Sequence, residues 1–238
     1  MMDESYGLTN YFASSISSSP LTKAGRATLT YGVLDEPAFS GVGRHVGVAS
    51  SYLSSLRPGD KVQVGVRSAA AGFHLPLEVN KTPIICIAAG TGLAPFRAFI
   101  QERAILHSNG QPLAPAVVFY GCRNPDIDDL YRGEMDEWEK FGVVTVYRAY
   151  SRRVDASHGC KYVQDRLWRE RETVGELWSK DARIYVCGSN KIAESAKEIL
   201  VQIVQEESGK MGHSMTNEEA AEWFEKQRNQ RFATDVFD

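Results

Sequence analysis

Residues 84–97 place a glycine turn between an apolar run and a helical pattern. The turn is Gly90-Thr91-Gly92, and Pro95 suits the first turn of the helix that would follow. Glycines let a backbone come close to a ligand, and a helix N-terminus attracts anions. The stretch therefore predicts a strand, a turn and a helix that bind a phosphate or pyrophosphate. Small turns of this kind are also common without a ligand, and this one differs from the G-x-G-x-x-G fingerprint.

Other predicted strands end in polar or reactive residues. Ser151-Arg152-Arg153 offers hydroxyl and guanidinium donors that suit a phosphate, and Lys161-Tyr162 adds a cation and a ring. Together these favour the 2′-phosphate of NADP, although a solvated basic loop is the alternative interpretation. Cys187 follows another apolar run, where the reactive end of a dinucleotide would lie. Its alternative is a small buried residue, because a free cysteine packs like a hydrophobic side chain.

The elements that must position these residues alternate between strands and helices after residue 83. We expect strands near 84–89, 116–121, 143–149 and 183–187, with helices near 95–108, 128–140, 161–172 and 190–206. A capping box at Thr216 predicts a last helix, and an apolar tail at 231–238 predicts a final strand. This alternation is typical of an α/β fold with a doubly wound parallel sheet, in which ligands bind at the carboxyl ends of the strands.

The first third of the chain has a different pattern. Strands at 27–34 and 61–66 with a short helix at 47–56 indicate part of an antiparallel β-barrel. The serines at 14–19 are typical of a flexible loop when considered alone. The change of pattern at Lys81-Thr82-Pro83 predicts a domain boundary, with a partial barrel domain at 1–80 and the α/β domain at 81–238.

Composition limits the classes of function. The 238 residues are 43% hydrophobic and 24% charged with a net charge of −3, which is typical of a globular protein and gives no general attraction to nucleic acid. No apolar run is long enough to span a membrane, and the first residues lack the pattern of a signal peptide. Four separated cysteines, with no C-x-x-C pair, argue against a metal site or a disulfide framework. We expect a cytoplasmic location.

The order of the motifs resembles the diflavin reductases of the ferredoxin–NADP reductase superfamily. The resemblance is strongest to the C-terminal FAD/NADP-binding part of NADPH–cytochrome P450 reductases, particularly of the fungal self-sufficient P450–reductase fusions. It extends from about residue 14 to the end of the chain. The motifs that carry it are Ser15–Pro20, Gly47–Ser50, Ala88–Arg97, Phe119–Arg123, Ser151-Arg152, Tyr162–Gln164, Tyr185–Gly188 and Asp235–Phe237.

The resemblance implies two cofactors, NADPH and FAD, and a cluster of three hydride-transfer residues. That cluster is Ser15, Cys187 and Asp235. The residues expected to bind NADPH are Gly90, Thr91, Gly92, Arg123, Ser151, Arg152, Lys161, Tyr162 and Gln164. The residues expected beside FAD are Ser17, Thr30, Gly47, Val48, Ala49 and Ser50, with Phe237 covering the flavin ring. The hydride chemistry belongs to the cofactors, and the protein supplies binding and orientation.

The implied function is an NADPH-dependent flavoprotein reductase. Hydride would pass from NADPH to FAD, and electrons would continue through FMN to a cytochrome P450 haem. The FMN and haem domains, fused or separate, would come from outside this stretch of sequence, which resembles the end of a reductase that starts inside its flavin domain. We expect no metal, no nucleic-acid partner and no membrane segment.

The sequence also departs from the family pattern. The family's Arg-x-Tyr-Ser at the flavin face is replaced by residues 12–15, Phe-Ala-Ser-Ser, and its lysine before x-Tyr-Val-Gln falls on Cys160, with Lys161 one place later. The acidic residue that often follows Cys-Gly is Ser189. An alternative function is therefore a truncated NADP(H)-binding module without stable flavin or turnover. A stand-alone ferredoxin–NADP reductase relative is a third interpretation, against which the truncated barrel argues.

Overall fold

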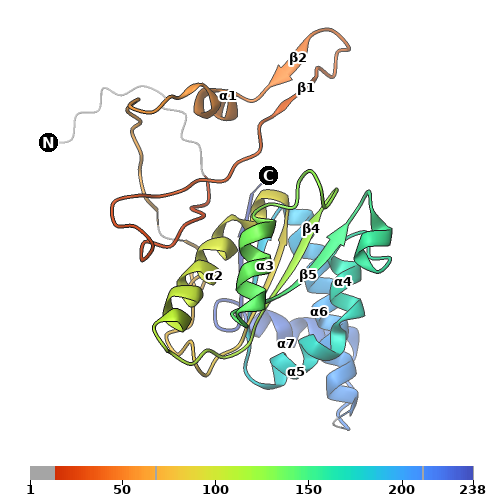
Figure 1. Cartoon of the computed structure of the whole chain (residues 1–238). Helices are drawn as coiled ribbons and strands as arrows, with labels where there is room; N and C mark the ends of the chain where they lie inside the picture. Colours follow the sequence, from red (N-terminus) through yellow and green to blue (C-terminus); the bar gives the residue numbers. More distant parts are fainter. Residues whose placement is uncertain (1–13, 68, 211, 238) are drawn as a thin grey trace, which may run out of the picture.

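A parallel sheet of five strands forms the centre of the structure, a computed structural model that describes residues 14–67, 69–210 and 212–237 (Figure 1). The strands are β3 (Ile84–Ala89), β4 (Ala116–Cys122), β5 (Thr145–Tyr150), β6 (Arg183–Gly188) and β7 (Phe232–Val236). Their order across the sheet is β5-β4-β3-β6-β7, and every pairing is parallel. Strands β4 and β5 therefore extend the sheet on one side of β3, and β6 and β7 extend it on the other. In a doubly wound sheet the crevice for a ligand opens at this change of strand order, between β3 and β6. The predicted fold class is confirmed.

Helices cover both faces of this sheet. Residues Ile84, Cys86 and Ala88 of β3 face one core, and Ile85 and Ile87 face the other, as expected for alternating side chains. The helices on the first face are α2 (Leu93–Ser108) and α3 (Arg132–Lys140). Those on the second are α4 (Val163–Arg169), α5 (Arg171–Ser179), α6 (Asn190–Lys210) and α7 (Asn217–Lys226). Burial on both sides explains the continuous apolar runs of the strands.

The helix bounds differ from those predicted, by two residues at the start of α2 and four at the end of α6, and two further differences have a local backbone cause. Helix α3 begins at Arg132, later than predicted, because Tyr131 before it has a left-handed backbone with φ of 54°. The predicted helix at 161–172 is two helices, since Glu170 leaves the helical region (φ −96°, ψ 23°) and separates α4 from α5. The capping box at Thr216 is confirmed, with Glu219 N–H donating to the Thr216 hydroxyl over 3.2 Å.

The first third of the chain forms an extended arm, here defined as residues 14–67. It contains β1 (Asp35–Pro37), β2 (Arg44–Val46) and helix α1 (Val48–Ser55), with β1 and β2 antiparallel. The predicted strands at 27–34 and 61–66 are wrong: the first makes one bridge, Ile16 to Leu29, and the second pairs with nothing among the described residues. An alternating pattern gives a strand only where a partner strand is at hand.

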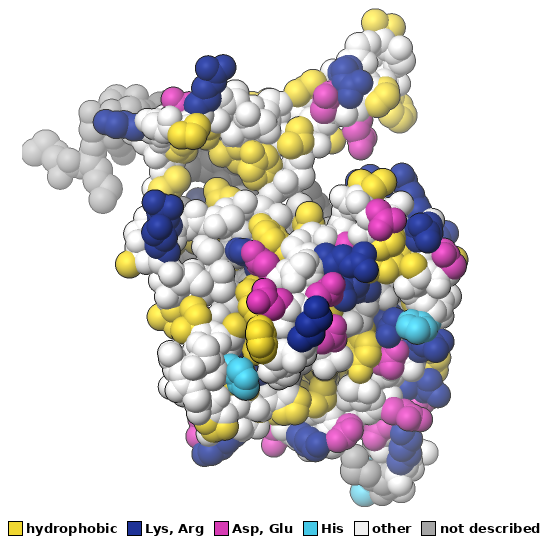
Figure 2. Space-filling model, viewed as in Figure 1, with side chains coloured by type: hydrophobic (Ala, Val, Ile, Leu, Met, Phe, Trp, Pro, Cys, Tyr) yellow, Lys and Arg dark blue, Asp and Glu magenta, His cyan; other side chains and the backbone are white. Residues whose placement is uncertain are grey.

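Hydrophobic side chains are exposed along this arm (Figure 2). Val64 and Val66 are 76% and 82% exposed, and Phe39 is fully exposed. The arm lies beyond the carboxyl ends of the sheet strands, on the side of the molecule where ligands would bind (Figure 1). Among the described residues no helix is long and apolar enough to cross a membrane, and all four cysteines are buried and unpaired.

Candidate functional site

A cleft of about 480 Å³ opens at the carboxyl edge of the sheet. It is bounded by the ends of β3 and β4, by the loop that follows β5, by the start of α4 and by residues 30–32 of the arm. Seven residues predicted to bind a cofactor line it: Thr30, Gly90, Thr91, Arg123, Ser151, Lys161 and Tyr162. Residues from separate parts of the sequence thus meet where the topology places a ligand.

The two glycines of the turn after β3 have different structural roles. Gly90 has φ of +54°, and a Cβ atom there would meet nothing within 4 Å, so its exposed backbone borders the cleft. Gly92 has an ordinary φ of −59°, but a Cβ atom there would lie 2.2 Å from the Cys187 carbonyl oxygen. Gly90 thus leaves the cleft open, and Gly92 lets the turn pack against the end of β6. No side chain caps α2, and its first N–H, that of Leu93, already donates to the Gly90 and Thr91 carbonyls, so an anion here would be attracted by the positive end of the helix dipole.

The basic residues after β5 are not equivalent. Arg153 is neutralised by Asp155, whose Oδ2 is 3.2 Å from its Nη2, and by Asp126 at 3.8 Å. Arg152 is exposed and forms no ion pair with the described residues, and its backbone N–H donates to the Arg123 carbonyl over 2.9 Å. The structure therefore singles out Arg152, which follows the cleft residue Ser151, as the guanidinium that is free for a phosphate.

The start of α4 adds a further basic residue, Lys161, to this part of the cleft. The Lys161 ammonium lies 5.1 Å from the centre of the Tyr162 ring, and both residues are exposed. Their backbone N–H groups donate to the Asp165 carboxylate over 3.0 and 2.8 Å, which fixes the turn that presents them. The Gln164 side-chain oxygen is buried without a hydrogen-bond partner among the described residues. A buried polar atom without a partner calls for an explanation, and a polar ligand bound at the start of α4 would supply one.

A loop between β4 and α3 holds Arg123 in a fixed position. The Asp128 carboxylate accepts from the Arg123 side chain over 2.8 Å and from the Asn124 backbone N–H over 2.6 Å. Partial burial favours a higher pKa for Asp128, but these hydrogen bonds outweigh burial and lower the pKa below its usual value. Asp128 is therefore ionised at neutral pH and orients Arg123 at the cleft.

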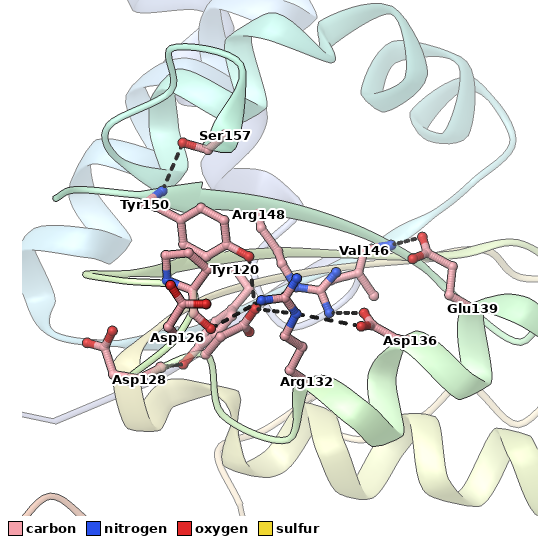
Figure 3. A network of polar contacts seen from close by, with 12 residues as sticks. Tyr120, Asp126, Asp128, Arg132, Asp136, Glu139, Val146, Arg148, Tyr150 and Ser157 are labelled. Atoms are coloured by element: carbon pink, nitrogen blue, oxygen red, sulfur yellow. Dashed lines mark hydrogen bonds and ion pairs between the residues drawn. The ribbon is translucent and has the colours of Figure 1, made fainter. Parts of the chain in front are cut away.

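A buried polar network supports the same loop from inside (Figure 3). Asp129 accepts from the Tyr150 hydroxyl over 2.8 Å and pairs with Arg148 over 3.0 Å. Arg148 reaches from β5 to Asp136 on α3, at 2.6 Å. Burial raises the pKa of the Tyr150 hydroxyl, so this group stays protonated and donates. The network joins the end of β5 to the loop that carries Arg123.

Ser15, Cys187 and Asp235 come together at the other end of the sheet edge. Cys187 of β6 and Asp235 of β7 are register partners, and the Ser15 hydroxyl donates to Asp235 over 3.4 Å. Burial, and to a smaller extent the nearby Asp235 charge, raise the pKa of the Cys187 thiol to about 12 against an opposing contact with Ser15. Cys187 is thus a neutral thiol at neutral pH, suited to pack and donate rather than to attack. The cluster predicted from three distant positions is present as a geometric unit.

The residues predicted beside a flavin are more scattered. Ser17 is fully buried, and its hydroxyl contacts the Thr28 carbonyl and the Tyr131 hydroxyl. Gly47 to Ser50 begin α1 in the arm, where the Ser50 hydroxyl accepts from Leu34 N–H over 3.2 Å. Phe237 is 44% exposed beyond β7 and donates its backbone N–H to the Gly188 carbonyl over 3.0 Å. Their roles at a flavin remain predictions.

Four residues near this edge are absent from the sequence-based prediction: Asp128, Arg97, Tyr131 and Glu134. Asp128 follows Arg123 by five positions, a spacing typical of a loop that folds back on itself. Arg97 and Tyr131 form contacts with the arm, described below, and Glu134 pairs with Arg97; the types and spacing of the three are ordinary for a helix and the turn before one. Only the structure brings them together.

Comparisons with known proteins agree with this geometry. Residues 86–198 match the family described as Oxidoreductase NAD-binding domain. The chain is 54% identical over 224 residues to a bifunctional cytochrome P450/NADPH–P450 reductase of Fusarium oxysporum. It is 49% identical over 226 residues to a self-sufficient cytochrome P450 monooxygenase of Phanerodontia chrysosporium, and 43% identical over 226 residues to a bifunctional cytochrome P450/NADPH–P450 reductase of Acremonium egyptiacum. Each match covers 94% of this chain and 21% of the relative, so the chain spans about a fifth of their length.

Proposed function

We propose that this chain, which is similar to the fungal P450–reductase fusions, corresponds to the C-terminal part of their reductase and is an NADPH-dependent flavoprotein reductase module. When bound, NADPH would supply a hydride that FAD accepts. The electrons would continue through an FMN domain to a cytochrome P450 haem, fused to the chain or separate from it. The cytoplasmic location and the boundary at residues 80/81 remain predictions.

The observation that carries the proposal is the order of groups across the sheet edge. From β5 to β7 the strand ends present Ser151 with Arg152, then Arg123, then Gly90–Gly92, then Cys187, then Asp235. From β5 to β6 is three strand spacings, about 14 Å, which suits an extended dinucleotide. Cations thus stand at one end, a turn suited to a pyrophosphate in the middle, and a thiol–carboxylate pair at the other end.

The residues present fit the adenosine end of NADPH. Arg152 and Lys161 are cations without ion pairs among the described residues, and the Gln164 oxygen has no protein partner there. Arg152 would hold the 2′-phosphate by charge-assisted hydrogen bonds, and Tyr162 would contact the adenosine. Thr91 and the backbone at Gly90 would bind the pyrophosphate, while the N-terminus of α2 favours its negative charge.

At the other end of the edge, the chain's own residues would orient the nicotinamide. Asp235 would stabilise positive charge that develops on the ring during hydride loss, because its carboxylate would lie near the ring in a partly buried site. The neutral Cys187 thiol would pack against the ring, and Ser15 would fix the Asp235 carboxylate through its hydrogen bond. Phe237 is exposed beyond β7 and would move to admit the ring.

A second candidate function is an NADP(H)-binding module that holds no flavin. The family's arginine and stacking tyrosine at the flavin face are missing from residues 12–15, of which 12 and 13 lie outside the described residues. The exposed hydrophobic side chains of the arm also favour this alternative for the chain by itself.

The visible spectrum of the purified chain separates the two functions. The chain is mixed with FAD, freed of unbound flavin, and then given NADPH without oxygen. A retained flavin band that NADPH bleaches supports the reductase. A colourless protein that still binds a 2′,5′-ADP resin would refute it in favour of the binding module. The Arg152→Ala variant is the control for specific retention on the resin.

A further inference from the structure

Arg97 on α2 binds three parts of the structure at once. Its Nη1 donates to the Ser17 carbonyl over 2.6 Å, and its Nε and Nη2 donate to both carboxylate oxygens of Glu134 on α3, over 2.7 and 2.9 Å. The guanidinium also lies 4.3 Å from the centre of the Tyr131 ring. Only 8% of Arg97 is exposed, so these contacts are largely shielded from water. A bidentate pair and a stacked ring fix the direction of the remaining N–H toward Ser17.

Tyr131 extends the same contact to a second segment of the arm, at Thr30. Its hydroxyl shares a hydrogen bond of 2.6 Å with the Thr30 hydroxyl and one of 3.4 Å with the Ser17 hydroxyl. Tyr131 has φ of 54°, an unusual backbone conformation for a bulky residue. Thr30 lines the cleft. The ring therefore joins the cleft wall to the Arg97 contact.

The next turns of α2 bind the arm a little further along. The Ser19 backbone N–H donates to the Gln101 side-chain oxygen over 2.8 Å, and the Ser19 hydroxyl donates to Glu102 over 3.1 Å. Ser17 and Ser19 are 0% and 1% exposed, so these small residues are buried at the contact. The serine-rich stretch is thus a docked strap, here defined as residues 15–19, and the flexible-loop alternative is wrong for it.

The strap ends at Ser15, whose hydroxyl contacts Asp235. Ser15 is two residues from the Ser17 carbonyl that Arg97 holds, a reach of about 7 Å at most. Helix α2 also begins directly after the Gly90–Gly92 turn. One helix therefore supports both the turn that would bind the pyrophosphate and the strap that places Ser15.

We propose that Arg97, with Glu134 and Tyr131, is a positioning residue that holds Ser15 against Asp235 and so sets the geometry of hydride transfer. This inference rests on the proposed function. Arg97 does not touch the Ser15–Cys187–Asp235 cluster and acts on it through the strap. Loss of the contact should lower the rate of hydride transfer while NADPH affinity is kept, because the groups at the adenosine end lie elsewhere on the sheet edge.

Hydrogen exchange on the whole chain tests the positioning without any cofactor. Arg97→Leu removes all the contacts, and Tyr131→Phe removes only the hydroxyl while the ring stays under the guanidinium. Arg171→Leu is the matched control, because Arg171 pairs with Glu206 over 3.2 Å and stacks on Trp168 on the other face of the sheet. We expect amides of the strap to exchange at least about 10-fold faster in both test variants and at the parent rate in the control. Unchanged exchange of the strap in Arg97→Leu would overturn the inference.

Stopped-flow flavin reduction by NADPH, in the FAD-loaded protein, measures the consequence. We expect the rate constant to fall about 10- to 100-fold in Arg97→Leu, as a small misplacement near the reacting groups can cause, with the NADPH dissociation constant within about twofold of the parent. Tyr131→Phe should show a smaller fall of the same kind. A parent rate constant with a mobile strap would contradict the positioning role. A parent protein that fails to reduce flavin would instead refute the proposed function, and exchange would still decide whether Arg97 holds the strap.

Discussion

Replacing Gly92 by alanine tests the packing that underlies the whole sheet edge. The new Cβ atom would lie 2.2 Å from the Cys187 carbonyl oxygen, 2.7 Å from its carbon and 3.1 Å from the Gly188 Cα atom. All three are backbone atoms of β6 or its end, so no side chain can rotate away. Overpacking costs up to about 3 kcal/mol when the surroundings cannot relax. For a chain of this size that corresponds to a fall in melting temperature of about 6–12 °C.

Gly133 of α3 provides a control with the opposite sign. A Cβ atom at Gly133 meets nothing within 4 Å, and its backbone has no positive φ. Gly133→Ala should therefore stabilise the protein by about 0.5–1 kcal/mol, through the lower entropy of the unfolded chain. The melting temperature should rise by about 1–4 °C.

Thermal unfolding followed by circular dichroism measures both variants. Gly92→Ala should also weaken NADP+ binding, because Thr91 and Gly90 must move with the displaced turn. A melting temperature of Gly92→Ala within 2 °C of the parent would refute the reasoning. It would mean that the turn and β6 are not packed as closely as the structure has them.

Three further predictions concern the charged and titratable groups of the edge. Arg152→Ala should weaken NADP+ binding about 10- to 150-fold in calorimetry, as the loss of a charged hydrogen bond of about 1.5–3 kcal/mol implies, and leave NAD+ unchanged. Arg153→Ala should change the binding of neither NADP+ nor NAD+, because Asp155 already pairs with Arg153. Equal losses of NADP+ affinity in the Arg152→Ala and Arg153→Ala variants would count against the assignment of Arg152 to the 2′-phosphate. Cys187 should resist iodoacetamide at pH 8 in the folded protein, because a thiol pKa of about 12 keeps it neutral; alkylation without unfolding would contradict this. The pKa of Asp128 is lower in the folded protein than in the unfolded chain, so the ionised carboxylate stabilises the folded state. This stabilisation is complete at a pH above the pKa of the unfolded chain, and it is lost as the pH falls through the pKa of the folded protein. Asp128→Asn should thus lower the melting temperature at pH 7 and leave it unchanged at pH 2, and an equal fall at both would be evidence against the charged contact.

The α/β part of the fold was predictable because the central strands β3, β4 and β6 are buried on both faces. Apolar runs and glycine turns mark such strands clearly, and the alternation of strands with helices indicates a parallel sheet with helices on both faces. Most element bounds differ by a few residues from those predicted, and the largest changes are at Tyr131 and Glu170, where one residue leaves the helical region. A single backbone angle of that kind has no clear sequence pattern.

The arm was less predictable because its strand-like segments have no neighbouring strand to pair with among the described residues. Residues 61–66 alternate as a strand should, yet Val64 and Val66 are exposed and nothing pairs with them among the described residues. Strand formation depends on neighbours, which the local sequence cannot supply.

The candidate site was predictable in its parts and not in its supports. Residues of the strand ends could be named because topology collects them at one edge. The difference between Arg152 and Arg153 depends on which carboxylates fold back, and the role of Arg97 depends on a contact with Ser17, 80 positions away. Such contacts between distant segments follow from the fold and have no signature in spacing.

Backbone amide shifts on adding two ligands test the central claim most directly. With 2′,5′-ADP, which carries only the adenosine end, the shifts should be confined to the ends of β4 and β5 and the start of α4, around Arg123, Ser151 and Tyr162. With NADP+, they should extend across Thr91 to Cys187 and Asp235. This difference would place the dinucleotide across the sheet edge with its nicotinamide at β6 and β7. The same set of amides shifting with both ligands, or shifts at Cys187 with 2′,5′-ADP alone, would contradict the account.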